Sequence, residues 1–145
     1  MVELTKILFI SDNLCGQGTM VWEGMMTEEG TMQLRRVVVK DSWIDPLRKY
    51  MEGMILSILN AHNIEGIPTL IHKKQVQAPY PSTITDVLVN NSTHFLRAFL
   101  SKHKTSPYYL RVLSQIITQP IGDLITKFSC LGELLVAFLD YVVGE

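Results

Sequence analysis

The 145-residue sequence has little cysteine, no surplus of either charge and no long apolar run. Its two cysteines, Cys15 and Cys130, lie far apart without the spacing of metal ligands, which predicts no metal site and a reducing compartment. A formal net charge of −1 gives no basic surface for nucleic acid. No apolar stretch reaches the roughly 18 residues that span a bilayer. These absences predict an intracellular protein, cytoplasmic or nuclear, without nucleic-acid or membrane partners.

The N-terminal part of the chain has the pattern of a β-meander. An apolar run at 7–10 predicts a first strand that ends near Leu14. A glycine turn then leads into a second strand around Val21. An acidic glycine turn then precedes a third strand at roughly 32–40. The third strand ends in three consecutive valines and Lys40, a pattern typical of a strand covered on both faces. Strands joined by such short turns pair antiparallel.

A helix is predicted directly after this strand. Asp45 supplies a capping carboxylate, and Pro46 suits the first helical position, where its missing N–H costs nothing. The helix should end around 61–63. Its apolar residues recur every 3.6 positions and predict one stripe facing the core, with Glu52 at the border of that stripe. The stripe consists of Leu47, Tyr50, Met51, Met54, Ile55, Ile58 and Leu59.

The rest of the chain is less regular. Strands are predicted at 67–71 and 109–117, and the stretch 73–107 between them is interpreted as an insertion of variable structure. Ser129 is a candidate cap for a final helix, in which Glu133 and Asp140 mark the solvated side. The apolar stripe of that helix contains Leu131, Leu134, Leu135, Phe138, Leu139 and Val142.

Three weak signals occur in an order that suggests phosphate binding. Gly16 and Gly18 are most simply a hairpin turn, but a turn without side chains can also close over phosphates. Lys40 is either a solvated edge lysine or a point charge for phosphate oxygens. Glu52 is either a surface partner of Arg48 or Lys49, or the residue that fixes the Lys40 ammonium. Their agreement in order and spacing favours the functional alternative.

Longer runs of the sequence carry a more specific resemblance, which covers most of the chain from about residue 11. The runs are Cys15–Trp22, Val39–Trp43, Glu52–Leu56, Ile64–Pro68, and Phe128–Ser129 followed by Glu133–Asp140. They resemble the fungal-type protein kinase family. The resemblance implies an α+β fold: the N-terminal lobe of a protein kinase, with an antiparallel sheet of about five strands, one packed helix and then C-lobe helices. The N-lobe would cover 1–118, including the insertion, and 119–145 would hold the hinge and first C-lobe helices.

The same resemblance implies where a nucleotide binds. ATP, with weak affinity, would be the cofactor, together with the Mg²⁺ ion that the family uses. Lys40 would contact its phosphates, and Glu52 would be the catalytic helix partner of Lys40. The hinge at 116–121 would meet the adenine edge through its backbone. The remaining residues implied at the nucleotide pocket are Gly16, Gly18, Thr19, Val21, Ile117 and Gln119.

The sequence departs from the family at the residues that perform the chemistry. Phosphoryl transfer to protein Ser or Thr needs an aspartate for the substrate hydroxyl, and an asparagine and a second aspartate for magnesium. No segment of the sequence supplies that set, so we expect a truncated chain that is inactive alone and holds no metal. The alternative is a non-catalytic interaction module, because an uncovered apolar helix can meet a partner or itself. That helix face would consist of Leu131, Leu135, Phe138 and Val142.

Overall fold

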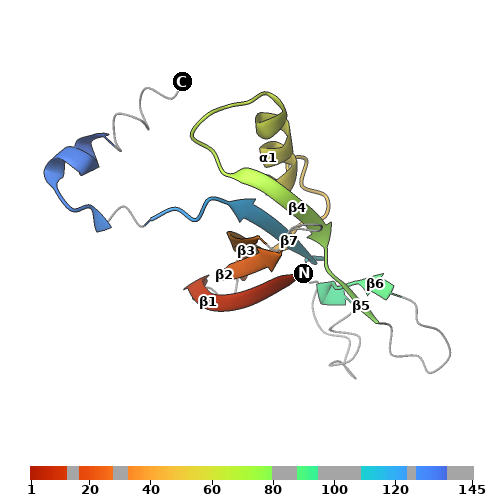
Figure 1. The fold of residues 1–145 in the computed structure, drawn as a ribbon. Helices are drawn as coiled ribbons and strands as arrows, with labels where there is room; N and C mark the ends of the chain where they lie inside the picture. The colour runs from red at the N-terminus through yellow and green to blue at the C-terminus, as the bar shows by residue number, and fades with distance from the viewer. Residues whose placement is uncertain (13–16, 28–32, 80–87, 95–108, 124–126, 137–145) are drawn as a thin grey trace.

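The computed structural model describes residues 1–12, 17–27, 33–79, 88–94, 109–123 and 127–136. Its elements are β1 (Val2–Ile10), β2 (Met20–Thr27), β3 (Leu34–Ile44), α1 (Glu52–Ala61), β4 (Thr69–Gln75), β5 (Gln77–Pro79), β6 (Leu88–Asn90) and β7 (Val112–Gln119). Residues 131–136 form a further short helix. Figure 1 shows α1 beside β4, with the β5–β6 pair beyond the far end of β4.

Five strands form one antiparallel sheet in the order β1-β2-β3-β7-β4. This confirms the predicted α+β fold, with a five-stranded antiparallel sheet and one helix packed on it. β3 lies at the centre, paired on both sides, and the two edges are β1 and β4. The described part of the stretch interpreted as an insertion contains the last three residues of β4 and the separate β5–β6 pair. The division of the chain at residue 118 stays a prediction.

The core lies on one face of the central strands. Val37 and Val39 are 0% and 2% exposed, and Ile117 of β7 packs with them. Trp22 of β2 and Ile117 are both paired with Val39, so the three side chains share a face. On the opposite face Val38 is half-buried. The valine run of β3 is therefore closed on one face and partly open on the other, rather than equally covered on both.

The strand that carries Lys40 is longer than predicted, and the helix begins later. β3 stays paired with β7 as far as Ile44, so Lys40 lies within the strand instead of at its end. The Asp45 carboxylate accepts the N–H of Leu47 at 2.8 Å, and its carbonyl accepts the N–H of Arg48 at 3.1 Å. These bonds close a turn rather than a helix, since Asp and Pro also favour turns. The predicted helix start at Asp45 is wrong, and α1 begins at Glu52.

The predicted apolar stripe of α1 does not face the core. Of the ten residues of α1, all of them described, Gly53 alone is buried. A Cβ atom on Gly53 would lie 3.1 Å from Ile116 Cγ2 and 3.3 Å from Lys73 Cβ, so the missing side chain permits the close approach of helix and sheet. The helix therefore turns its glycine side inward. Five residues of the expected stripe are exposed: Leu47 and Tyr50 before the start of α1, and Met54, Ile55 and Ile58 on the helix.

Polar side chains hold both ends of α1 to the sheet. At its C-terminal end Asn60 accepts the N–H of Leu70 at 2.6 Å and donates to the carbonyl of Pro68 at 3.1 Å. At its N-terminal end Glu52 pairs with Lys40, and Lys73 donates to the carbonyl of Gly53 at 3.4 Å. The position of the helix thus depends on polar contacts at its two ends more than on apolar burial between them.

The helix at 131–136 begins beside Ser129, as expected. The Glu133 carboxylate accepts the Ser129 hydroxyl at 2.6 Å and the Ser129 N–H at 2.7 Å. The bond from the Ser129 hydroxyl, and to a smaller extent the bond from its N–H, lower the pKa of Glu133 below its usual value. Phe138, Asp140 and Val142 of the predicted stripe lie outside the described residues. Within the described part of the chain, no helix is both long and apolar enough to cross a membrane.

Candidate functional site

Lys40 and Glu52 form an ion pair between the sheet and the helix. The Lys40 ammonium donates to Glu52 Oε1 at 2.8 Å and to Oε2 at 2.6 Å. The pair is partly open to water, since the Lys40 side chain is 28% exposed and that of Glu52 50%. Lys40 comes from the centre of the sheet and Glu52 from the first position of α1. Both oxygens of one carboxylate therefore hold one ammonium.

The register of the sheet shows what surrounds Lys40. It is paired with Val21 of β2 on one side and with Ile116 of β7 on the other, and Ile116 is paired in turn with Lys73 of β4. Residues directly opposite in antiparallel strands point to the same face. Gly53 of α1 approaches Ile116 and Lys73 on that face. Val21, Lys40 and α1 thus share one side of the sheet.

The end of the glycine turn is fixed to the end of β3. Gly18 has a φ of +50°, and a Cβ atom there would lie 3.1 Å from Trp43 Cδ1. The Trp43 N–H donates to the carbonyl of Gln17 at 2.7 Å, and the Ser11 N–H donates to that of Thr19 at 2.9 Å. Thr19 and Gly18 therefore lie at the same end of the sheet as Lys40.

Gly16 lies outside the described residues. Trp43, which holds the glycine turn through its ring and its N–H, received no role from sequence reasoning. Met20 pairs with Asp41, so the turn before Met20 lies beside residue 43. Only the strand register reveals this, and register is not readable from the local pattern.

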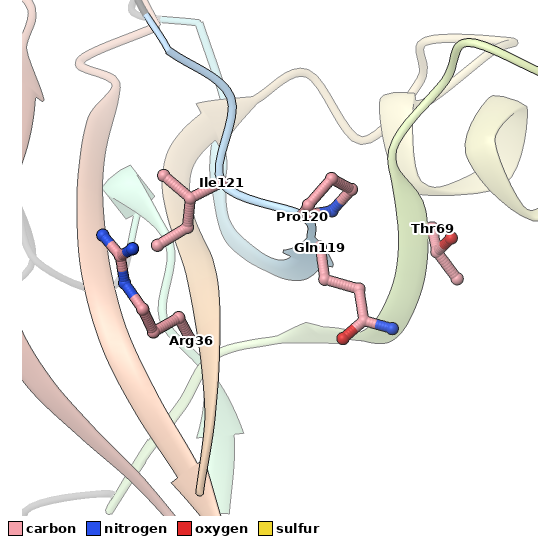
Figure 2. A pocket seen from close by; sticks show the side chains of 5 residues that line it. All are labelled: Arg36, Thr69, Gln119, Pro120 and Ile121. Atoms are coloured by element: carbon pink, nitrogen blue, oxygen red, sulfur yellow. The ribbon is translucent and has the colours of Figure 1, made fainter.

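The residues predicted to form the hinge lie farther along the sheet, away from the glycine turn. Gln119 is the last residue of β7, and Pro120 and Ile121 follow it. These three residues line an open pocket of about 360 Å³ with Arg36 and Thr69 (Figure 2). Gln119 is three residues beyond Ile116, the neighbour of Lys40, which corresponds to ~10 Å along a strand. The pocket and the Lys40 ammonium therefore lie at two separate positions along the strands of the sheet.

Arg36 at this pocket is engaged with a neighbouring strand. Its guanidinium donates to Glu23 Oε1 at 2.8 Å. This hydrogen bond, and then the negative charge of Glu23, raises the pKa of Arg36 above its usual value, so the group stays charged. Sequence reasoning gave Arg36 no role. The alternation along β3, in which residues 36, 38 and 40 share a face, is the signal that could have found it.

The side chain of Ile117 lies away from Lys40. It is 7% exposed within the core on the opposite face, next to Val39. Its neighbour Thr118, which is paired with Val38, points to the Lys40 face instead. Ile117 can therefore contact a nucleotide beside Lys40 only through its backbone.

Metal ligands do not gather at this site. Across the described residues, no group of three or more His, Cys, Asp or Glu side chains could hold a metal ion. Glu52, the acidic group nearest to Lys40, has both oxygens engaged with the ammonium. The residues present here do not fit a magnesium site of their own.

A lysine on the third strand paired with a glutamate of the following helix is the arrangement that orients ATP phosphates in protein kinases. The chain belongs to the fungal protein kinase family, whose family model matches residues 1–145. No curated protein and no solved structure gave a significant match to the chain.

Proposed function

We propose that these residues form the nucleotide-binding lobe of a fungal protein kinase, with ATP as the ligand. The observation that carries the proposal is the Lys40–Glu52 pair at 2.6 Å on the face that also holds Val21. In this family the activity is ATP-dependent phosphoryl transfer to protein Ser or Thr. The ammonium supplies rotating donors for several phosphate oxygens, and Glu52 keeps it from swinging away.

In the proposed site, the phosphates and the adenine of the nucleotide bind at different positions along the strands. Gly18 and Thr19, at the end of the glycine turn, would cover the phosphates beside Lys40. The backbone near Gln119 would meet the adenine edge, ~10 Å away along the sheet. On the same face, Val21 beside Lys40 and Val38 two residues earlier on β3 offer apolar surface for the base and sugar. Magnesium would arrive with ATP, because none of the described residues forms a site for it.

We further propose that the 145 residues bind nucleotide without transferring phosphate by themselves. Transfer requires an aspartate beside the substrate hydroxyl, and an asparagine and a further aspartate on magnesium. The sequence contains neither a His-Arg-Asp nor an Asp-Phe-Gly segment. Loss of positioning and metal groups together removes most of the rate acceleration of such enzymes.

A thermal melt with and without Mg·ATP tests nucleotide binding. At a ligand concentration about ten times Kd, binding stabilises the folded state by ~1.4 kcal/mol. For a domain of this size we expect Tm to rise by roughly 3–6 °C. Magnesium with tripolyphosphate is the control for binding of the anion alone, and should raise Tm less. A cooperative melt that does not respond to ATP would contradict the proposal.

A second candidate function is self-association through the helix at 131–136. Leu131 and Leu135 on this helix are 72% and 62% exposed, which leaves apolar surface for a second copy of the chain. If this surface is an interface, Leu135→Asp should convert a dimer into a monomer in sedimentation velocity. Leu110→Asp, at a residue 47% exposed outside the helix, is the matched control and should leave the dimer intact. A wild-type chain that is monomeric at high micromolar concentration excludes this candidate.

A further inference from the structure

Trp43 lies beside the glycine turn, on the side of the sheet away from Lys40. It is three residues beyond Lys40 on β3, in a stretch that pairs with β7 without a register shift. Side chains three residues apart on a regular strand point to opposite faces. The half-buried indole ring therefore lies on the face opposite the Lys40 ammonium. In that position it can support the turn from behind and leave the phosphate side open.

The ring of Trp43 fills the space that a side chain at residue 18 would need. A Cβ atom on Gly18 would lie 3.1 Å from Trp43 Cδ1 and 3.9 Å from Trp43 Nε1. The shorter distance is tighter than nearly all real Cβ contacts, so ring and turn fit together because residue 18 has no side chain. The φ of +50° at Gly18 also favours glycine. The turn thus rests directly on the indole ring.

The backbone of Trp43 fixes the orientation of the peptide group between Gln17 and Gly18. The Trp43 N–H donates to the carbonyl of Gln17 at 2.7 Å. In a planar trans peptide the C=O and N–H bonds point in opposite directions, so the Gly18 N–H points away from β3. Among the described residues, none accepts a hydrogen bond from this N–H. An oriented backbone donor of this kind is available to an anion.

We infer that Trp43 is a positioning residue for phosphate: it holds the peptide before Gly18 so that the Gly18 N–H donates to a phosphate oxygen beside Lys40. The inference rests on the proposed function, because it takes the phosphates to lie at Lys40. A donor that is already fixed in its bound orientation loses less conformational freedom when the ligand arrives. Nucleotide affinity therefore depends on a ring that does not itself touch the nucleotide.

A purely structural role for Trp43 gives a different expectation. A ring that only packs against the turn contributes to the free energy of unfolding, so its loss would lower Tm. The affinity of the chain that remains folded would then be unchanged. The two roles are separated by measuring affinity and Tm on the same variants.

The test is isothermal titration calorimetry of Trp43→Ala with Mg·ATP and with magnesium tripolyphosphate. Alanine keeps the backbone N–H and removes the ring. We expect both ligands to bind at least about fivefold more weakly than to the wild type, since they share the phosphates. Trp43→Phe keeps an aromatic ring against Gly18, so affinity should stay within about twofold of the wild type. Tyr109→Ala, at a residue 87% exposed, is the matched control and should bind as the wild type does.

Tryptophan emission gives a second readout. The sequence contains two tryptophans, so Trp22→Phe leaves Trp43 as the only one. Saturating magnesium tripolyphosphate should change the Trp43 emission, because the anion binds to the turn that rests on the ring. If Trp43→Ala does not fold, this emission and the affinity of Trp43→Phe decide the question.

Wild-type binding with unchanged affinity in Trp43→Ala overturns this inference alone. A loss seen with Mg·ATP but not with tripolyphosphate also overturns it, since the effect would then lie at the adenine. The same holds for a Trp43→Phe variant that folds but binds as weakly as Trp43→Ala, and for Trp43 emission that does not respond to the bound anion. A wild-type chain that binds neither ligand rejects the proposed function, and this inference with it.

Discussion

Replacing Lys40 with methionine should weaken Mg·ATP binding about 10- to 100-fold while leaving Tm within a few degrees of the wild-type value. Hydrogen bonds from an ammonium to phosphate oxygens contribute ~1.5–3 kcal/mol, and methionine retains the apolar stem while removing the charge. The pair with Glu52 adds little to folding, because side chains that are 28% and 50% exposed form a solvent-screened ion pair worth at most ~1 kcal/mol. Isothermal titration calorimetry with the melts measures both quantities.

The matched control is Lys6→Met, which removes one positive charge from the edge strand β1 and should bind ATP as the wild type does. Glu52→Gln should weaken binding less than Lys40→Met, since it frees the ammonium without removing it. Wild-type affinity in the Lys40→Met variant would place the phosphates elsewhere and reject the site.

Replacing Val39 with aspartate should abolish the cooperative melt. Val39 is 2% exposed within the core cluster, so a carboxylate there has neither water nor a partner. The cost is ~4–5 kcal/mol or more, a large part of the ~5–15 kcal/mol that holds a domain folded. Circular dichroism against temperature is the measurement.

Leu34→Asp is the control on the same strand, because Leu34 is 63% exposed and its replacement should shift Tm by no more than a few degrees. A Val39→Asp variant that melts cooperatively near the wild-type temperature would mean that the core lies elsewhere.

The parts of the fold predicted from sequence are those whose signals are local. The valine run and the glycine turns predicted the β-meander, and the eleven residues between Lys40 and Glu52 suffice to connect a strand to the next helix. The helix start was missed because Asp45-Pro46 suits a turn as well as a helix. What decided between them was the pairing of β3 with β7 up to Ile44, a contact between residues distant in sequence.

The orientation of α1 could not be predicted from periodicity. A hydrophobic stripe counts large apolar side chains, but the closest approach of helix and sheet occurs at Gly53, which has no side chain to count. The prediction of a hinge had a similar limit. The resemblance placed it at 116–121, which stays a prediction, but which of Ile117 and Thr118 faces Lys40 depends on the register between β7 and β3.

Because polar contacts hold α1 at its two ends, the helix can tilt as a rigid body about one of them. Asn60 fixes one end to β4, and Glu52 stands eight residues away, a length of ~12 Å at the rise of an α-helix. A rotation of about 20° around Asn60 would carry the Glu52 backbone ~4 Å. That displacement exceeds the range of a hydrogen bond, so a small tilt separates the carboxylate from Lys40 while every strand of the sheet remains paired.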